Sequence, residues 1–439
     1  MEPPLLPPDH AQRLLLAAEL HTRPPEAMRA PARVSYIAVL VDAAQRERER
    51  QHLADLCDRH GVTAPDAEAT HFRATLGEVR LKWERHGEFS GYTALADGVS
   101  DAPFAYTAAG MLLPGWLADV PGQTVTAVHA ELRVAQGDPP DAAELARLFG
   151  GASVAGSEVA EGAALVCTDF RLHEDGCTHV QVLDYRLGDR QAGRLLQRLF
   201  EIEAYRMLAL LALPIARSQL PRIADIESSL ATLTERIARD EGDDESLLQA
   251  LTGLAAEVES GIAASQFRFG ACEAYHGLVL RRIAELRERR QPGLQTIDEF
   301  MTRRLTPAVA TCATVSQRLL GLSERVAQAS ALLSTRVDIA RERQNQALLS
   351  SMDRRAKLQL RLQQTVEGLS VAAIVYYVVG LVGYLSKGLK AGGWPVNADL
   401  AAALAVPVVG VVVLLAVRRA RKHVSEDESV HRGSPEPLP

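Results

Sequence analysis

The chain has 439 residues, of which 47% are hydrophobic and 23% charged, and its formal net charge is −7. This length leaves room for more than one domain, and the acidic balance argues against a general nucleic-acid-binding protein. Five cysteines without C-x-x-C spacing indicate neither a disulfide framework nor a zinc site. The first residues lack a basic segment followed by an apolar one, so we expect no cleaved signal peptide.

Residues 1–188 are predicted to form a cytoplasmic α+β domain. A β-branched apolar run over 34–41 predicts a buried strand, and 43–60 reads as a charged helix. From residue 70 the hydrophobic period changes towards two, which is typical of strands. The remaining predicted strands cover 70–76, 79–86, 88–95, 124–134, 153–159, 163–172 and 177–187, with a short helix over 141–149. Strands gathered with few helices indicate a mixed or largely antiparallel sheet.

Residues 189–368 are predicted to be a helical bundle and stalk. Pro214 and an acidic break at 240–244 divide its first part into helices. From Val309 to Ala340, apolar residues recur every three or four positions, so a coiled-coil-like stalk is predicted over 308–361. This stripe can pack against the preceding helices of its own chain or against another copy in a homo-oligomer, and the sequence leaves both open.

Two apolar runs follow, and they predict a transmembrane hairpin. The runs cover 369–385 and 400–417, joined by a loop at 386–399 and followed by a tail at 418–439. Each would span roughly 26 Å as a helix, close to the ~30 Å of a hydrocarbon core. Neither run contains a charged residue, which removes the usual sign of an ion or proton relay.

Basic residues flank the hairpin on its outer sides. They are Arg354, Arg355, Lys357 and Arg361 before it, and Arg418, Arg419, Arg421 and Lys422 after it. The positive-inside rule therefore places both the large N-terminal part and the tail in the cytoplasm, with the loop outside. We expect these side chains to contact anionic lipid headgroups of the bilayer.

The first apolar run carries small and hydroxyl side chains at helical spacing. Gly380 and Gly383 share a face, and Ser370, Tyr377 and Tyr384 repeat every seven residues. A helix-packing seam is the simpler interpretation, and a pore-lining face is the alternative.

Two weak candidate sites lie in the first domain. Glu84, His86 and Glu88 alternate along a predicted strand, where a histidine and two carboxylates could hold a divalent metal, although a solvated strand face with cross-strand ion pairs is the simpler interpretation. His21 and Arg23 precede a stiff Pro-Pro pair and could bind an anionic ligand. No dinucleotide, P-loop, G-x-S-x-G or H-E-x-x-H motif occurs, so no catalytic residue or cofactor is assigned.

Three long strings carry a family resemblance. They read ELHTRPPEAMRAPARVSYIAVL near the start, LKWERHGEFSGYT in the sheet region, and RVDIARERQNQALLSSMDRRAKLQLRLQQTVEGLSVAAIVYYVVGLVGYLSKG before the loop. With these strings the chain resembles a domain-of-unknown-function family of bacterial membrane-anchored proteins. The resemblance implies an inner-membrane location and no particular activity.

The predicted layout is also similar to that of CorA-type magnesium transporters. That family carries Gly-Met-Asn just after its first membrane helix, whereas this chain has Gly383-Tyr384-Leu385 there. The leading hypothesis is therefore a non-enzymatic scaffold or sensor at the inner membrane. A CorA-like divalent-cation channel formed by a homo-oligomer is the alternative, and a metal-dependent enzyme at Glu84 and His86 is a third.

Overall fold

A computed structural model of the protein describes residues 7, 9–14, 16, 25–112, 115–391, 393 and 397–431. The chain divides into two compact units, Met1–Leu333 and Ser334–Pro439. The first unit contains the sheet and the helices that cover it. The second contains the apolar helices.

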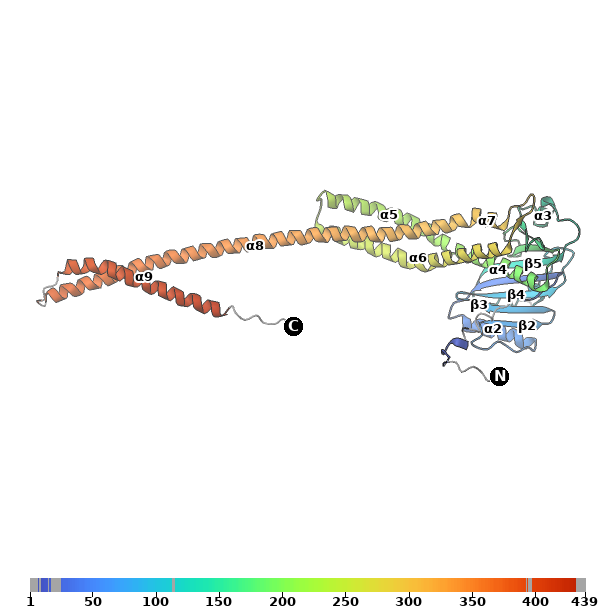
Figure 1. The fold of residues 1–439 in the computed structure, drawn as a ribbon, viewed down its shortest axis with the longest axis horizontal. Coiled ribbons are helices and arrows are strands. Elements are labelled where there is room, and N and C mark those ends of the chain that lie inside the picture. The colour runs from blue at the N-terminus through green and yellow to red at the C-terminus, as the bar shows by residue number, and fades with distance from the viewer. Residues whose placement is uncertain are drawn as a thin grey trace. The chain divides into compact units, whose positions relative to one another are not determined.

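The described strands form one nine-stranded sheet in the order β2-β3-β4-β1-β5-β8-β7-β6-β9. Strands β2 to β5 are labelled in Figure 1. The strands are β1 (Ala32–Leu40), β2 (His71–Leu76), β3 (Val79–Arg85), β4 (Phe89–Asp97), β5 (Gln123–Val134), β6 (Ala155–Val159), β7 (Ala164–Thr168), β8 (Thr178–Asp184) and β9 (Arg289–Arg290). The predicted mixed sheet is confirmed. Its strand segments agree with the prediction because their period-two pattern is interrupted by turn residues such as Gly77, where φ is +64°.

The sheet consists of two antiparallel halves joined by a parallel pair. β5 and β8 form the only parallel ladder among the described strands, with Val128 opposite Thr178 and Val134 opposite Asp184. On one side of this pair lie β2, β3, β4 and β1, and on the other lie β7, β6 and β9. The side chains at the β5–β8 pair therefore come from distant parts of the sequence.

Helices follow the sheet and continue to the end of the described chain. They are α4 (Asp189–Leu210), α5 (Ala212–Ala238), α6 (Asp244–Leu286), α7 (Ile297–Arg304), α8 (Thr306–Ala391) and α9 (Ala398–His431). The predicted break at Pro214 lies instead at Leu211, because proline is tolerated in the first turn of α5, where its missing N–H costs no hydrogen bond. Pro307 has the same place in α8.

The two faces of the sheet pack against different helices. One face packs on α4, with Val34, Val128 and Val182 in the largest core cluster. The opposite face carries two smaller cores, one under α2 (Arg46–Arg59) and one under α3 (Ala142–Leu148). A segment with a short 3₁₀ turn, Ala109–Met111, also lies against this face, since the N–H of Ala109 donates to Ser35 Oγ on β1 (3.0 Å).

The apolar stripe of α8 is buried within its own chain up to the end of the first unit. Val315, Leu322 and Leu333 belong to the same core cluster as residues of α5 and α6. Arg318 pairs with Glu227 on α5 (2.7 Å), and Ser323 donates to Glu259 on α6 (2.7 Å). The packing partner that the sequence left open is therefore intramolecular for this part of the stripe.

The second unit contains the two apolar runs. α8 and α9 are long and apolar enough to cross a membrane, and no part of the most apolar 18-residue window of either helix is buried in the chain. Both helices extend beyond the predicted segments, because the polar residues that flank the apolar runs continue the helical backbone to Ala391 and His431.

Candidate functional site

The loop between β7 and β8 carries an alternating run of metal-binding residue types. Its sequence His-Glu-Asp-Gly-Cys-Thr-His puts His173, Asp175, Cys177 and His179 at every second position. The loop turns at Gly176, where φ is +75°, a conformation that favours glycine. The N–H of Gly176 donates to the carbonyl of His173 (2.9 Å).

A fifth side chain, His129, comes from β5. In the parallel ladder it lies directly opposite His179. It faces away from α4, because its neighbours Val128 and Ala130 belong to the core on the α4 face. The five residues of this histidine cluster are His129, His173, Asp175, Cys177 and His179.

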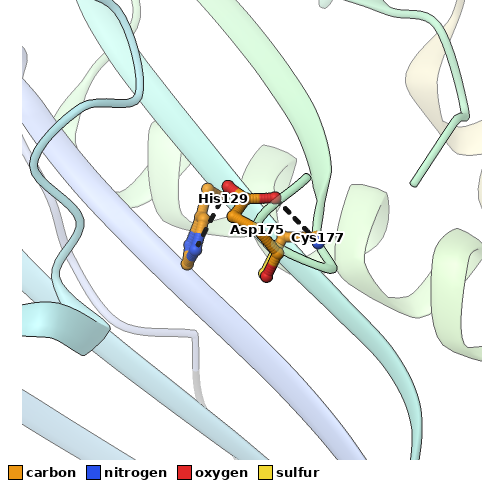
Figure 2. A group of neighbouring side chains, drawn as sticks. All are labelled: His129, Asp175 and Cys177. Atoms are coloured by element: carbon orange, nitrogen blue, oxygen red, sulfur yellow. Dashed lines mark hydrogen bonds and ion pairs between the residues drawn. The ribbon is translucent and has the colours of Figure 1, made fainter. Parts of the chain in front are cut away.

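Asp175 lies next to both His129 and Cys177 (Figure 2). Its Oδ2 lies 2.8 Å from Nε2 of His179 and 4.0 Å from Nε2 of His129. Its Oδ1 accepts a hydrogen bond from the backbone N–H of Cys177 (2.9 Å). Donor atoms of His129, Asp175 and Cys177 all lie within 4.8 Å of one another.

The imidazole of His129 is fixed by a contact with the neighbouring strand β1. Its Nδ1 lies 2.9 Å from the hydroxyl oxygen of Ser35 on the neighbouring strand. That oxygen also accepts the N–H of Ala109, which fixes the hydroxyl in place. The contact leaves Nε2 of His129 directed towards Asp175.

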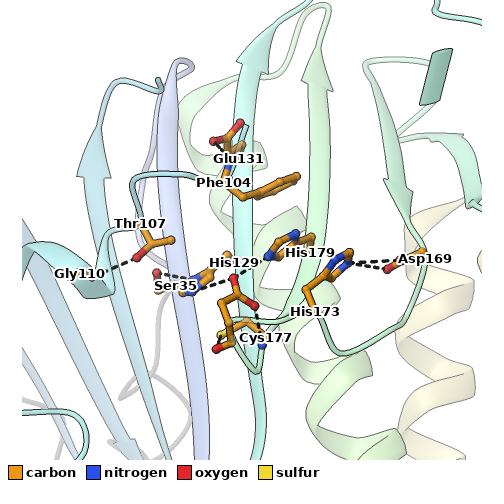
Figure 3. A network of polar contacts seen from close by, with 11 residues as sticks. Ser35, Phe104, Thr107, Gly110, His129, Glu131, Asp169, His173, Cys177 and His179 are labelled. Carbon is orange, nitrogen blue, oxygen red and sulfur yellow. Dashed lines mark hydrogen bonds and ion pairs between the residues drawn. The ribbon is translucent and has the colours of Figure 1, made fainter. Parts of the chain in front are cut away.

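The imidazole of His179 is held by ring stacking (Figure 3). His173 stacks on it with centroids 4.0 Å apart, and Phe104 stacks on it at 4.3 Å. The backbone of Phe104 is fixed in turn by the buried carboxylate of Glu131, which accepts its N–H (2.8 Å). Nε2 of His173 lies 3.2 Å from Oδ2 of the buried Asp169.

Burial and hydrogen bonds shift the pKa values of three residues of the histidine cluster. Burial lowers the pKa of His129 to about 4, so this imidazole is neutral at pH 7. Burial also opposes ionisation of Asp175, but hydrogen bonds from His179 and from the N–H of Cys177 outweigh it, and the pKa of Asp175 is lowered. Burial, with the nearby Asp175, raises the pKa of the Cys177 thiol to about 12. The cluster thus offers imidazole nitrogen, carboxylate oxygen and sulfur in one place.

A separate cleft lies on the α4 face of the sheet. Its volume is about 310 Å³, and its walls come from β1, β3, β4, α4 and α6. Lys82 and Glu84 form an almost buried ion pair in it (2.8 Å), and Arg282 pairs with Glu201 opposite. Burial, with smaller effects of Tyr205 and Glu84, raises the pKa of Tyr36 in the same cleft.

The structure brings together part of the first predicted site. Glu84 and His86 both line the cleft, and the ring of His86 stacks on Phe89 at 4.2 Å. Glu88 follows the turn at the end of β3 and pairs with Arg268 on α6. A metal held by all three predicted residues would require Glu88 to leave this pair, so that site stays a prediction. His21 and Arg23 lie outside the described residues.

The predicted face of the first apolar run is partly gathered in a groove of the second unit. Tyr377, Gly380, Gly383 and Tyr384 line it together with residues of α9. The hydroxyl of Ser370 instead donates to the carbonyl of Val366 in its own helix (2.9 Å). A role of this face in helix packing or in a pore stays a prediction.

The basic residues at the flanks of the apolar runs are exposed where their side chains are described. These are Arg354, Arg355, Lys357, Arg361 and Arg419. Lys357 pairs with Asp353 one turn earlier (2.7 Å). The side chains of Arg418, Arg421 and Lys422 lie outside the described set. Headgroup contacts of these residues stay a prediction.

Sequence reasoning did not find the histidine cluster. It expected no zinc site at the cysteines, because none of them has C-x-x-C spacing. The available signal was the alternation from His173 to His179, which places four residues of metal-binding types within seven positions. His129 has no local signal, because only the β5–β8 pairing brings it to the loop.

The chain matches one protein family over most of its length. A family profile described as "Protein of unknown function (DUF3422)" matches residues 8–424. The chain belongs to the DUF3422 family. The match extends from the segment before the sheet to beyond the second apolar run. The family profile therefore covers most of both units. No curated protein and no solved structure matches, and the likeness to CorA-type transporters therefore has no support from a relative.

Proposed function

We propose that this DUF3422 protein is a membrane-anchored scaffold or sensor, with its sheet unit held at the cytoplasmic face of the inner membrane. The observation that carries the proposal is the unburied apolar surface of α8 and α9 in the second unit. Large side chains such as Leu369, Leu381 and Val408 are well exposed there. Apolar area in water costs about 25 cal/mol per Å², so such a surface requires lipid or a protein partner.

The charge of the flanks supports the orientation. The basic residues before α8 enters its apolar run and after the apolar run of α9 lie at the two outer ends of the hairpin. The segment between the helices has fewer positive charges. The positive-inside rule then puts both outer ends, and the sheet unit with them, in the cytoplasm.

Two features of the sheet unit support a binding role over a purely mechanical anchor. The cleft beside Lys82 and Glu84 is about 310 Å³, a size that suits a small ligand, and the histidine cluster offers a mixed donor set. Either site would let a cytoplasmic signal act on a protein that stays at the membrane.

The experiment that tests the proposal is cysteine accessibility in spheroplasts. All five native cysteines are buried, which gives a low background for thiol labelling. Asn397→Cys lies between the helices and Ser350→Cys lies on α8 before the apolar run, and both positions are exposed. We expect a membrane-impermeant maleimide to label Asn397→Cys in intact spheroplasts, and Ser350→Cys only after lysis.

The controls separate anchoring from orientation. The wild-type chain should label weakly before and after lysis, and carbonate washing should leave it in the membrane fraction. Release by carbonate would contradict membrane anchoring. Labelling of Ser350→Cys but not of Asn397→Cys in intact spheroplasts would invert the orientation and remove the cytoplasmic assignment.

A further inference from the structure

We propose that His129, Asp175 and Cys177 bind a transition-metal ion of the zinc class, with His179 as the fourth ligand. This site lies in the sheet unit and does not depend on the membrane role proposed above. It uses donors from β5, from the β7–β8 loop and from the start of β8.

The chemistry of the donors selects the class of metal. Imidazole nitrogen and thiolate sulfur are typical ligands of Zn²⁺ and of related late transition metals, whereas Mg²⁺ and Ca²⁺ prefer oxygen. A set of two histidines, one cysteine and one aspartate supplies four ligands, the number found in tetrahedral zinc sites. Glu174 in the same loop is not needed.

The distances are close to those that a bound ion requires. Donor atoms around a tetrahedral Zn²⁺ are about 3.3–3.8 Å apart, given bond lengths of roughly 2.0–2.3 Å. Here the atoms of His129, Asp175 and Cys177 lie within 4.8 Å of one another (Figure 2). The contraction required is at most about 1.0–1.5 Å. Asp175 can move towards the other donors, because it sits on a turn with its side chain 38% exposed.

His179 is the fourth ligand because it already shares Oδ2 of Asp175 with the site. Its Nε2 is 2.8 Å from that oxygen, where an ion between the two groups would replace the hydrogen bond. The strand register sets His179 opposite His129, and their ring centroids are 6.2 Å apart. The two imidazoles can thus approach one ion from neighbouring strands.

The residues around the proposed ligands hold them in position, as metal sites require. A ligating histidine usually bonds through its other nitrogen to an acceptor that fixes the ring. Ser35 Oγ serves Nδ1 of His129 in this way (Figure 3). Phe104 and His173 stack on His179 and hold its ring in place. Ser35 and His173 therefore act as positioning residues and not as ligands.

The test is metal binding by the full-length protein purified in detergent, with Zn²⁺ and Co²⁺ as probes. We expect about one Zn²⁺ per chain by elemental analysis and a competition titration against a coloured chelator. Co²⁺ should give a sulfur-to-metal charge-transfer band, because Cys177 is a ligand. Cys177→Ser should abolish that band, and His129→Gln should weaken Zn²⁺ binding more than about 100-fold. Ser35→Ala should weaken it roughly 10-fold, as loss of a second-layer contact does.

Matched variants make the result decisive. His60→Gln changes an exposed histidine at the end of α2 and should leave Zn²⁺ binding unchanged. Asp175→Asn keeps the size of a side chain on an exposed turn, so it tests the ligand set if Cys177→Ser fails to fold. The proposal is overturned if the folded protein takes up no Zn²⁺, if the Co²⁺ band survives Cys177→Ser, or if binding depends on His60 and not on His129.

Discussion

Glu49 is a carboxylate held inside the core on the α2 face of the sheet, where only 1% of its surface is exposed. Its Oε1 accepts hydrogen bonds from the indole N–H of Trp83 (3.0 Å) and from the hydroxyl of Tyr92 (2.6 Å). Both donors are buried among apolar side chains. The carboxylate therefore satisfies two polar groups that have no access to water.

We predict that Glu49→Ala lowers the free energy of unfolding by about 2–4 kcal/mol, because it leaves two buried donors without an acceptor. Thermal unfolding in detergent, followed by tryptophan fluorescence, measures the loss. Glu47→Ala is the control on the same helix: its side chain is 73% exposed, so we expect a much smaller loss of stability than for Glu49→Ala. Equal effects of the two variants would contradict the role given to Glu49.

At the residue scale, the sequence shows which residue types could form a site more reliably than which residues come into contact. The sequence prediction grouped Glu84 and His86, which both line the cleft, but it did not single out Lys82, which pairs with Glu84. The pair forms because both side chains point to the α4 face, and its burial depends on helices more than 100 residues later in the chain. His129 was missed for the same reason, since its partners lie in another strand.

Helix α4 crosses closely over the segment that precedes β1, and Gly193 permits the approach. A Cβ atom on Gly193 would lie 1.8 Å from the carbonyl oxygen of Glu26. The same segment is fastened by a hydrogen bond from the N–H of Met28 to the carbonyl of Asp189 (3.1 Å) and by ion pairs of Glu26 with Arg73 and Arg80. Glu26 and Gly193 also line the cleft.

We predict that Gly193→Ala displaces this segment and destabilises the protein by about 1–3 kcal/mol, as overpacking of a close contact does. The same change at Gly253, an exposed position on α6 where an added methyl group would meet no atom within 4 Å, is the control. There alanine should stabilise the helix by about 0.5–1 kcal/mol. A stabilising effect at both glycines, measured by thermal unfolding, would show that the crossing is not tight.

Elements were predicted more reliably than their arrangement. The period-two strands and the amphipathic helices follow from local pattern, and the structure confirms them. The strand order was not predictable, because the parallel β5–β8 pair joins segments separated by α3, β6 and β7. The helix boundary at Leu211 was misplaced because a proline was taken as a stop when it begins the next helix.

At the scale of the whole molecule, the boundary at Leu333 separates a unit that buries its apolar side chains from a unit that exposes them. The unit up to Leu333 buries its apolar stripe on α5, α6 and α8 in one core. Beyond it, the apolar side chains of the second unit are exposed to the surroundings. The stripe up to Leu333 thus packs within its own chain.

We predict that a fragment ending at Leu333 is soluble without detergent and folded, because it contains the complete sheet and the core of the first unit. The full chain should remain in the membrane fraction. Circular dichroism and light scattering of the fragment check this, with a monomer expected. An aggregated or unfolded fragment would show that the first unit needs the helices that follow it.

The parallel β5–β8 pair also has a consequence for synthesis on the ribosome. When Val134 has been made, β5 has its partner β1 on one side, but the residue that pairs with Val134 on the other side is Asp184, 50 residues later. At about 5–20 residues per second, this edge of a twelve-residue strand stays open for roughly 3–10 s. An open edge invites pairing with another nascent chain, so translation speed over residues 135–184 should bear on the yield of correctly folded protein.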